Sequence, residues 1–357
     1  MIYKQVLPRK RASTLKRNPN KEQTLYIRIF KNWIMKKIGV FSSGGDSPGM
    51  NAAIRAVYKA CVANGIEALG IYHGYNGMIS GETCLLNEGL TEGIVRRGGT
   101  ILKSARSEAF RTKEGREKAY RFLSESGIEG LVAIGGDGTY RGLKALRDEF
   151  NIPAIGIPGT IDNDLYGTEY TLGYDTAVNT AVECIDRIMD TAESHDRMFF
   201  VEVMGRDAGF IALNAGMATG AGGILIPEDP NDWAELYAVL EKRGKAGVKE
   251  PFLVVVSEGE KAGNAFYLSE EIKTKYPNFD VKVSVLGHIQ RGGSPTWFDR
   301  VLGGKMGVSA VEALLQGKTD LAVGIKGEEM VFTPFEQAVK LHRIPDSESI
   351  RISKILR

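Results

Sequence analysis

The sequence lacks the features of a secreted, membrane-spanning or zinc-binding protein. It contains only three cysteines, Cys61, Cys84 and Cys184, and none of them belongs to a CxxC or CxxH pair. An odd number of cysteines without such spacing predicts neither a disulfide framework nor a zinc site. Reduced cysteines that pack as small hydrophobic residues are the simpler interpretation. No apolar run approaches the roughly 18 residues of a transmembrane helix, so we expect a cytoplasmic protein that binds no membrane.

Composition and length are ordinary, apart from one residue type. Hydrophobic residues make up 43% and charged residues 25% of the 357-residue chain, which excludes disordered, collagen-like and coiled-coil proteins. A chain of this length is expected to form two or three domains. Glycine is the exception, because its 43 residues far exceed the usual share of about 7%. Tight turns, or backbone that approaches a ligand closely, would require so many glycines.

An excess of positive charge is confined to the N-terminus. Residues 1–34 carry nine lysines and arginines and a single acid, Glu22, whereas the remainder has 37 basic and 43 acidic residues. The mildly acidic body gives no reason to expect nucleic-acid binding. A transit peptide, or an arm that touches nucleic acid or membrane, is one interpretation of the basic segment. We favour a disordered extension, or an upstream start codon, ahead of a domain that begins near Met35.

From residue 36 onward, short β-branched runs alternate with amphipathic helical patterns. This alternation is typical of βαβ units, in which helices cover both faces of a parallel sheet. No Pro/Ser-rich linker divides the strands, so we predict an α/β protein of two closely packed, Rossmann-like lobes, each with three αβα layers and a mostly parallel sheet. The predicted strands cover residues 36–42, 67–74, 127–136, 152–158, 198–205, 222–227, 251–259 and 281–287, and the predicted helices cover residues 51–65, 141–150 and 176–194.

Polar or glycine-rich residues follow six of these strands. Ligands of such sheets bind beyond the C-terminal ends of the strands, and so many polar tips are hard to explain by folding alone. We therefore predict a binding site there. The tips are Gly44, Gly45 and Asp46; Gly135, Gly136, Asp137, Gly138 and Thr139; Thr160, Ile161, Asp162, Asn163 and Asp164; Met204, Gly205 and Arg206; Glu258; and the segment from His288 to Arg291.

Two of the tips are Gly-Gly-Asp loops between a strand and a helix. Glycine lets a phosphate approach the backbone, and the helix N-terminus supplies N–H donors. Neither loop has the GxGxxG or GxxxxGK[ST] pattern, and plain turn chemistry is an alternative for each. The second loop adds the carboxylate of Asp137. Magnesium is typically held by one or two carboxylates together with substrate phosphates, so Asp137 is a candidate Mg²⁺ ligand.

The segment TIDND places two acids, Asp162 and Asp164, at one strand end. One carboxylate is then able to accept a hydroxyl proton while another faces a metal, as phosphoryl transfer requires. An Asx-turn with solvated acids is the structural alternative. Arginines near predicted loops, Arg106, Arg197 and Arg206, fit phosphate recognition, although a single arginine is more often a surface charge.

Together these motifs resemble bacterial-type ATP-dependent 6-phosphofructokinase, the phosphofructokinase A family, from about Met35 to the end of the chain. The matching segments are IGVFSSGGDSPGMNAAIR, RRGGTILKSAR, AIGGDGTYRG, PGTIDND, VEVMGR, SEG and VLGHIQRGGSP. The resemblance implies a glycolytic kinase that transfers the γ-phosphoryl group of ATP to the 1-hydroxyl of fructose 6-phosphate. It also implies an active site in the cleft between two lobes, of residues 35–173 plus 290–340 and residues 174–289 plus 341–357, and a homotetramer with active sites shared between subunits.

The resemblance also implies a role for each matching residue. Asp162 would be the general base and Asp137 the Mg²⁺ ligand, while Thr160 touches the transferring phosphoryl group and Arg106 and Arg206 stabilise its charge. The ATP site would comprise Gly45, Arg106, Ser107, Gly136, Asp137, Gly138 and Thr139. The fructose 6-phosphate site would comprise Thr160, Ile161, Asp162, Met204, Gly205, Arg206, Glu258, Lys282, His288 and Arg291, with Arg197 from a neighbouring subunit.

Departures from the family pattern refine this expectation. Gly138 and Gly159 stand where diphosphate-dependent relatives typically carry Asp and Lys, which favours ATP as donor. Lys282 replaces a common Arg, which predicts a weaker grip on the 6-phosphate or altered cooperativity. In the effector site, Arg55 is kept and Lys59 is a conservative change. Familiar charged residues are replaced by Glu88, Met189 and Gly222, so we expect weak or altered regulation by ADP and phosphoenolpyruvate.

Other functions remain open from the sequence. NAD kinases and lipid kinases share a GGDGT loop but lack TIDND and GHIQRGG. A dinucleotide dehydrogenase is disfavoured because no GxGxxG follows a strand. A diphosphate-dependent phosphofructokinase and a catalytically silent sugar-phosphate-binding regulator are the remaining alternatives. The regulator would be expected to have lost Asp137 or Asp162, and both are present.

Overall fold

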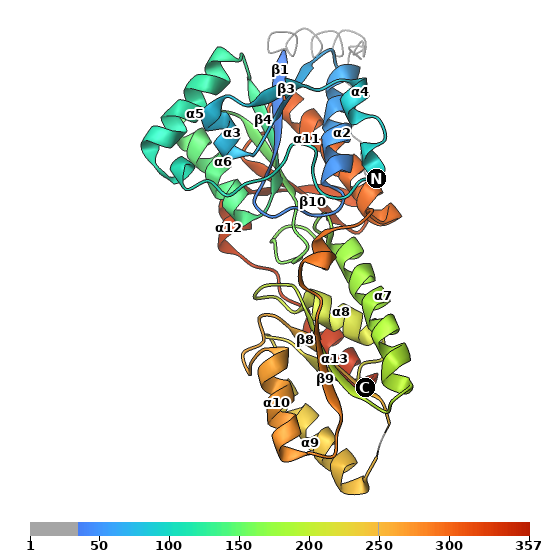
Figure 1. Ribbon diagram of the computed structural model, residues 1–357. Coiled ribbons are helices and arrows are strands. Elements are labelled where there is room, and N and C mark those ends of the chain that lie inside the picture. The colour runs from blue at the N-terminus through green and yellow to red at the C-terminus, as the bar shows by residue number, and fades with distance from the viewer. Residues whose placement is uncertain (1–34, 249) are drawn as a thin grey trace, which may run out of the picture. The chain divides into compact units, whose positions relative to one another are not determined.

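A computed structural model describes residues 35–248 and 250–357. The expectations for residues 1–34 lie outside this range. Every helix and strand named below belongs to one compact unit, Lys36–Arg357, and its elements form two β-sheets with helices on both faces of each (Figure 1).

The first sheet has seven strands in the order β11-β10-β5-β4-β1-β2-β3. Its five inner strands run parallel, and the two edge strands, β3 and β11, pair antiparallel with β2 and β10. The prediction of a mostly parallel sheet is confirmed, whereas β3, β10 and β11 had not been predicted. The strands are β1 (Lys37–Ser43), β2 (Glu67–Ile71), β3 (Thr83–Leu85), β4 (Gly130–Gly135), β5 (Ala154–Pro158), β10 (Leu321–Lys326) and β11 (Glu329–Pro334).

Two groups of helices cover the faces of this sheet (Figure 1). On one face α2 (Met50–Ala63) packs along α11 (Trp297–Leu315). Their backbones come so close that a Cβ added to Gly307 would lie 2.6 Å from the Cβ of Ala56, which accounts for part of the glycine content. The other face carries α3 (Tyr75–Ser80), α5 (Lys113–Glu125), α6 (Asp137–Phe150) and α12 (Phe335–Lys340). Phe41, Tyr140 and Phe335 are buried on that side.

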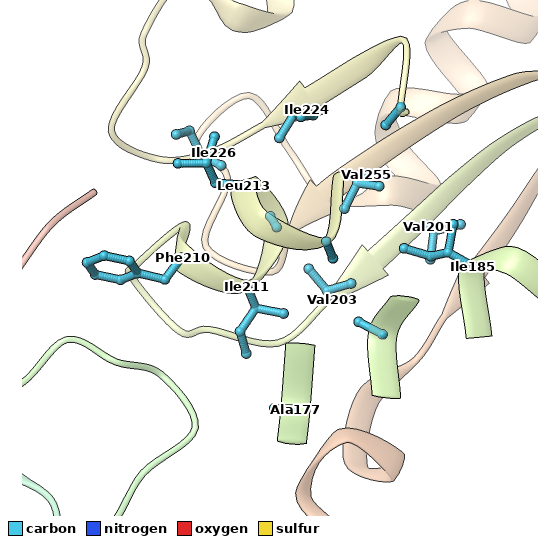
Figure 2. Packing of buried hydrophobic residues seen from close by; sticks show 14 of the residues in the cluster. Ala177, Ile185, Val201, Val203, Phe210, Ile211, Leu213, Ile224, Ile226 and Val255 are labelled. Atoms are coloured by element: carbon cyan, nitrogen blue, oxygen red, sulfur yellow. The ribbon is translucent and has the colours of Figure 1, made fainter. Parts of the chain in front are cut away.

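The second sheet has four parallel strands in the order β7-β8-β6-β9. They are β6 (Met198–Val203), β7 (Gly223–Leu225), β8 (Phe252–Ser257) and β9 (Val281–Val285). One face packs against α7 (Tyr174–Glu193), α8 (Phe210–Ala218) and α13 (Ser347–Ile355), and the other against α9 (Asp232–Ala246) and α10 (Ala265–Lys275). Figure 2 shows Ile185, Val201, Ile211 and Val255 in the first of these cores. Alternate residues of β6 enter the two cores, as the strand period of two requires.

The chain passes between the two sheets more than once. The chain reaches the second sheet through α7 and returns to the first sheet at α11. It then supplies β10 and β11 to the first sheet, and finally α13 packs on α8 beside the second sheet. Short helices fill the connections: α4 (Glu88–Thr91), η1 (Ile94–Arg96), η2 (Ala109–Arg111) and η3 (Gly287–Arg291). Among the described residues, none of the helices combines the length and apolar character that crossing a membrane requires.

Candidate active site

A cavity of about 640 Å³ opens at the C-terminal ends of β1, β4 and β5. It brings together all the residues expected to bind the nucleotide and all four expected to act in catalysis. Four of the residues expected to bind the sugar also line the cavity: Thr160, Asp162 and Arg206, which are expected to act in catalysis as well, and Arg291. The predicted residues that line it are Gly45, Arg106, Ser107, Gly136, Asp137, Gly138, Thr139, Thr160, Asp162, Arg206 and Arg291.

The second Gly-Gly-Asp loop ends where α6 begins, at Asp137. The sequence had predicted this helix from residue 141, so its first turn was wrongly assigned to the loop. Thr139, inside that turn, donates from its Oγ1 to the carbonyl of Ser43 at 3.2 Å. The Oδ1 of Asp137 accepts the N–H of Gly138 at 2.7 Å. A carboxylate in the first turn is favoured by the helix dipole, and the same N-terminus favours phosphate.

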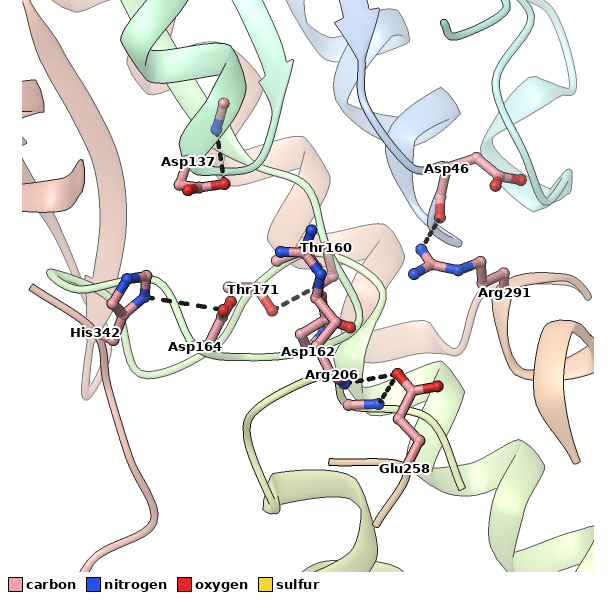
Figure 3. Close-up of polar contacts among 12 residues, drawn as sticks. Asp46, Asp137, Thr160, Asp162, Asp164, Thr171, Arg206, Glu258, Arg291 and His342 are labelled. Atoms are coloured by element: carbon pink, nitrogen blue, oxygen red, sulfur yellow. Dashed lines mark hydrogen bonds and ion pairs between the residues drawn. The ribbon is translucent and has the colours of Figure 1, made fainter. Parts of the chain in front are cut away.

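The TIDND loop is held by side chains that are not themselves predicted site residues. Asn163 has a left-handed backbone, with φ of 56°, and its Oδ1 accepts the N–H of Thr171 at 2.9 Å. The hydroxyl of Thr171 donates to the carbonyl of Thr160 at 2.7 Å. These bonds close the loop upon itself, so that Asp162 and Asp164 project from a fixed backbone (Figure 3).

Asp162 is a buried acid, and this contradicts the alternative of an Asx-turn with solvated acids. Its side chain is only 4% exposed, and among the described residues its Oδ1 has no hydrogen-bond partner. Burial raises the pKa of Asp162, while the charge of Arg291, the Thr160 hydroxyl and the charge of Arg206 act against the rise. A buried carboxylate with a raised pKa and an unpartnered oxygen is suited to accept a proton.

Asp164 shares this environment. Its pKa is raised to about 6, first by burial and then by the charge of Asp162, against the opposing effects of its own backbone, His342 and Arg206. The His342 ring lies 4.0 Å from the Asp164 carboxylate, as Figure 3 shows.

Loops of the second sheet complete the site. Arg206 approaches Asp162, with 3.8 Å between Nε and Oδ2. Glu258, beyond β8, accepts the backbone N–H groups of Gly205 and Arg206 at 3.2 and 2.7 Å. Gly205 has a φ of 146°, and an added Cβ would lie 2.5 Å from the carbonyl oxygen of Ala208. Only glycine fits there, so the backbone carrying Arg206 has little freedom.

The segment after β9 joins the two sheets. Gln290 is fully buried, and its Oε1 accepts the N–H of Met204 at 2.9 Å. Arg291 donates from Nη1 to the carbonyl of Asp46 at 3.2 Å. The sequence analysis included Gln290 in the segment from His288 to Arg291 but assigned a role only to His288 and Arg291. A buried glutamine within such a motif was the signal that would have found it.

Seven of the expected sugar-site residues do not line the cavity: Ile161, Arg197, Met204, Gly205, Glu258, Lys282 and His288. Ile161 is fully buried in the core. His288 lies exposed on η3. Arg197 and Lys282 both pair with Asp280, at 2.8 and 2.7 Å.

Arg197 and Lys282 lie at the opposite end of the second sheet from the cavity. Arg197 directly precedes β6, and Lys282 pairs in register with Phe199 near the start of the same strand. Met204 follows the other end of β6. At a rise of about 3.3 Å per residue the separation is about 20 Å. Neither cation can therefore reach the cavity of its own chain from this position.

The far end of the cavity contains residues that sequence reasoning missed. Tyr75 stacks on Phe110 with ring centroids 3.9 Å apart, and the Tyr75 hydroxyl donates to the carbonyl of Thr139 at 2.6 Å. These residues come from separate elements and form no motif, so no sequence pattern indicated them. The further lining residues are Ser43, Gly44, Arg111, Arg116, Arg141, Gly142, Ala145 and Gly159.

Three comparisons connect this geometry with known proteins. The profile of the family described as Phosphofructokinase matches residues 37–314. ATP-dependent 6-phosphofructokinase 1 of Thermus thermophilus is 53% identical over 322 residues, which cover 90% of this chain and 99% of the relative. ATP-dependent 6-phosphofructokinase 2 of Bacteroides thetaiotaomicron is 47% identical over 322 residues, covering 90% and 98%.

A solved structure agrees with these relatives. Phosphofructokinase from Saccharomyces cerevisiae superposes with a TM-score of 0.80 at 29% identity, covering 90% of this chain and 46% of the yeast chain. The chain thus spans about half the length of the yeast protein but nearly all of its bacterial relatives. Because the family profile covers most of the sequence and the bacterial relatives match it almost end to end, this chain belongs to the phosphofructokinase family.

Proposed function

We propose that this protein is an ATP-dependent 6-phosphofructokinase, which converts fructose 6-phosphate and ATP into fructose 1,6-bisphosphate and ADP. The observation that carries the proposal is the buried carboxylate of Asp162, with an unpartnered oxygen, in the same cavity as the N-terminus of α6. The bacterial relatives named as ATP-dependent 6-phosphofructokinases support it.

In the proposed mechanism Asp162 acts as the general base. Its Oδ1 accepts the proton of the sugar 1-hydroxyl as that oxygen bonds to the γ-phosphorus and the bond from phosphorus to the β,γ-bridging oxygen breaks, which releases ADP. Thr160 and the guanidinium groups of Arg106 and Arg206 donate hydrogen bonds to the transferring phosphoryl group. Most of the catalysis of such a loose transition state comes from positioning and electrostatic stabilisation.

Asp137 is the residue that would hold magnesium. Its Oδ1 accepts the N–H of Gly138, and its Oδ2 lies 3.0 Å from Nη2 of Arg141. One carboxylate with phosphate oxygens and water is a donor set that suits Mg²⁺, and the described residues contain no cluster of three or more His, Cys, Asp or Glu that would suggest another metal. When bound, the ion would neutralise charge on the phosphate oxygens.

The nucleotide and sugar sites divide the remaining residues. Gly45, Ser107, Gly136, Gly138 and Thr139 would contact ATP. Met204, Gly205, Glu258, His288 and Arg291, with the backbone of Ile161, would hold the sugar. Arg197 and Lys282 would bind the 6-phosphate of a neighbouring subunit's substrate, because they lie too far from the cavity of their own chain.

This division of the sites rests on two further proposals. The ATP-binding lobe would comprise residues 35–173 plus 290–340, and the sugar-binding lobe residues 174–289 plus 341–357. Sharing of Arg197 and Lys282 requires an oligomer, for which we propose a homotetramer. A cytoplasmic location stays a prediction.

Space around two glycines favours ATP over diphosphate. A Cβ added at Gly138 meets no atom within 4 Å, so a side chain there would extend into open space next to Asp137. At Gly159 a Cβ would lie 2.9 Å from both Ile134 and Met50, which leaves no room for a lysine without rearrangement. The donor site thus lacks the charged groups expected in a diphosphate-dependent enzyme.

Initial rates with fructose 6-phosphate and Mg²⁺, measured with ATP and with diphosphate, test the proposal. We expect turnover with ATP alone, and a loss of about 10³-fold or more in kcat for Asp162→Asn. Glu193→Gln, an exposed acid at the end of α7, serves as the control and should be unaffected. Turnover with diphosphate would contradict the donor assignment. Inactivity with both donors, with sugar phosphate still bound, would favour the silent regulator.

A further inference from the structure

Arg141 and Asp137 form an ion pair inside the nucleotide cavity. Arg141 follows Asp137 by four residues, about one turn of α6, and its Nη2 lies 3.0 Å from Oδ2 of Asp137. Both residues line the cavity. The other oxygen of Asp137 accepts the N–H of Gly138, so Arg141 is bonded to the oxygen that would otherwise be open to a ligand.

The other arginines at this end of the cavity are paired differently. Arg111 pairs with Glu108 at 3.4 Å and Arg116 with Glu149 at 2.7 Å, and neither of these acids lines the cavity. Arg141 is therefore the cation whose partner is the proposed metal ligand. An arginine and a magnesium ion that share one carboxylate oxygen repel each other, so bound magnesium weakens the contact of Arg141 with Asp137.

We propose that Arg141 is a nucleotide-site residue that exchanges partners when magnesium binds. Without the metal, Arg141 neutralises Asp137, which would otherwise repel the triphosphate. With the metal bound to Asp137, the arginine turns away from the carboxylate into solvent. Its side chain is 60% exposed and that of Asp137 is 27% exposed, so the exchange needs no rearrangement of the core. This inference rests on the proposed metal role of Asp137.

The exchange predicts opposite effects on two binding constants. Removing the charge in Arg141→Met leaves Asp137 facing the triphosphate alone, so metal-free ATP should bind more weakly. Magnesium then has no competitor and no adjacent cation, so Mg–ATP should bind as well as before or more tightly. A residue that only stabilised α6 would change both constants in the same direction, because an ordinary i,i+4 pair contributes little beyond helix stability.

Calorimetry on the full-length protein without sugar phosphate tests this. The dissociation constant of ATP is measured once with EDTA and once with excess Mg²⁺, and the first value is divided by the second to give a ratio. We expect Arg141→Met to raise the ratio about fivefold, from the loss of one unit charge near the metal. Arg141→Lys, which keeps the charge, should give a smaller change. Arg111→Met is the matched control, because it removes a cavity cation that does not touch Asp137. It should weaken both constants and leave their ratio unchanged.

Asp137→Asn tests the proposed magnesium-binding role of Asp137 separately from the partner exchange of Arg141. We expect it to lower the ratio, and we expect Arg141→Met to have no further effect on the ratio in that background. If Asp137→Asn lowers the ratio while Arg141→Met alone leaves it at the wild-type value, the partner exchange is wrong and the metal site stands. If Asp137→Asn leaves the ratio unchanged, the metal role of Asp137 is wrong and the exchange fails with it.

Discussion

The carboxylate of Asp299, in the first turn of α11, accepts both the backbone N–H and the hydroxyl of Thr176 in the first turn of α7, at 2.9 and 2.6 Å. Its other oxygen accepts the N–H of Gly173 at 2.7 Å. Asp299 is fully buried. One acid therefore joins α7, through which the chain enters the part built around the second sheet, to α11, through which it leaves. Asp299 also caps the N-terminus of α7 although it belongs to another helix.

Truncation of Asp299 should destabilise the protein strongly. Asp299→Ala leaves the buried N–H groups of Gly173 and Thr176 without acceptors, and we expect a loss of about 3 kcal/mol in the free energy of unfolding. Urea unfolding measures it. Glu312→Ala, at an exposed position of the same helix, should change the free energy by no more than about 0.5 kcal/mol. Equal effects of the two variants would contradict the capping role.

Asp299 also predicts a pH dependence of stability. Burial raises its pKa from 3.8 to about 6 against the bonds from Thr176 and Gly173. The folded state thus binds this proton more tightly than the unfolded chain. The contribution of the group is greatest at acid pH, falls as pH rises between about 4 and about 6, and is constant above. Asp299→Asn should remove that component from the pH profile of the unfolding free energy.

Two charges near Asp162 should shift the pH dependence of activity in opposite directions. Arg291 lowers the pKa of Asp162 and Glu258 raises it. Because Asp162 must be ionised to accept a proton, Arg291→Met should move the acid limb of the kcat/KM profile to higher pH, and Glu258→Gln should move it to lower pH. Shifts of the same sign would show that the limb does not report Asp162.

The donor site predicts an effect of a single carboxylate at Gly138. An added Cβ meets open space there, so Gly138→Asp should fold normally while its charge repels the triphosphate next to Asp137. We expect KM for ATP to rise about tenfold or more, from a like charge within a few ångströms. Gly138→Ala, which adds the methyl group alone, should leave KM within about twofold. A large effect of alanine would mean that backbone freedom, not charge, matters at this position.

Lys282 should limit the affinity for fructose 6-phosphate. It pairs with Asp280 through a single ammonium group, and an arginine could bind a phosphate through two N–H groups. Lys282→Arg should lower the half-saturating concentration of fructose 6-phosphate without changing KM for ATP. Lys273→Arg, whose lysine pairs with Glu270 on exposed α10, is the control. An unchanged half-saturation would exclude a phosphate contact at position 282.

Effector binding should be weak for an electrostatic reason. Lys59 of α2 is paired with Glu88 of α4, so its charge is already neutralised by the acid that stands where the family pattern has an Arg. A Cβ on Gly222 would lie 2.3 Å from the Phe252 ring, which leaves no room for the glutamate familiar at this position. We expect a flat rate response to ADP and phosphoenolpyruvate, and a partial gain of response in Glu88→Arg. Strong ADP activation of the wild type would contradict this.

Much of the inner fold was predictable because it depends on local patterns. The buried runs that became β1, β4, β5, β6 and β8 are short and rich in Val and Ile, and the α7 pattern has helical spacing. The edge strands β3 and β11 were missed because their residues are partly or fully exposed and β3 is only three residues long. The start of α6 was missed because Asp137 and Gly138 read as loop residues, whereas the fold uses them as a first helical turn.

The sequence by itself determined which residues are candidates for the chemistry, since strand, glycine turn and acid are adjacent in the chain. Only the tertiary structure decided which of them meet. It placed Arg206 beside Asp162 and Arg291 beside Asp46, and it put Arg197 and Lys282 at the opposite end of the second sheet. Such pairings depend on the register of strands and on crossings between two sheets. They are fixed by packing between segments distant in the chain, which no local pattern encodes.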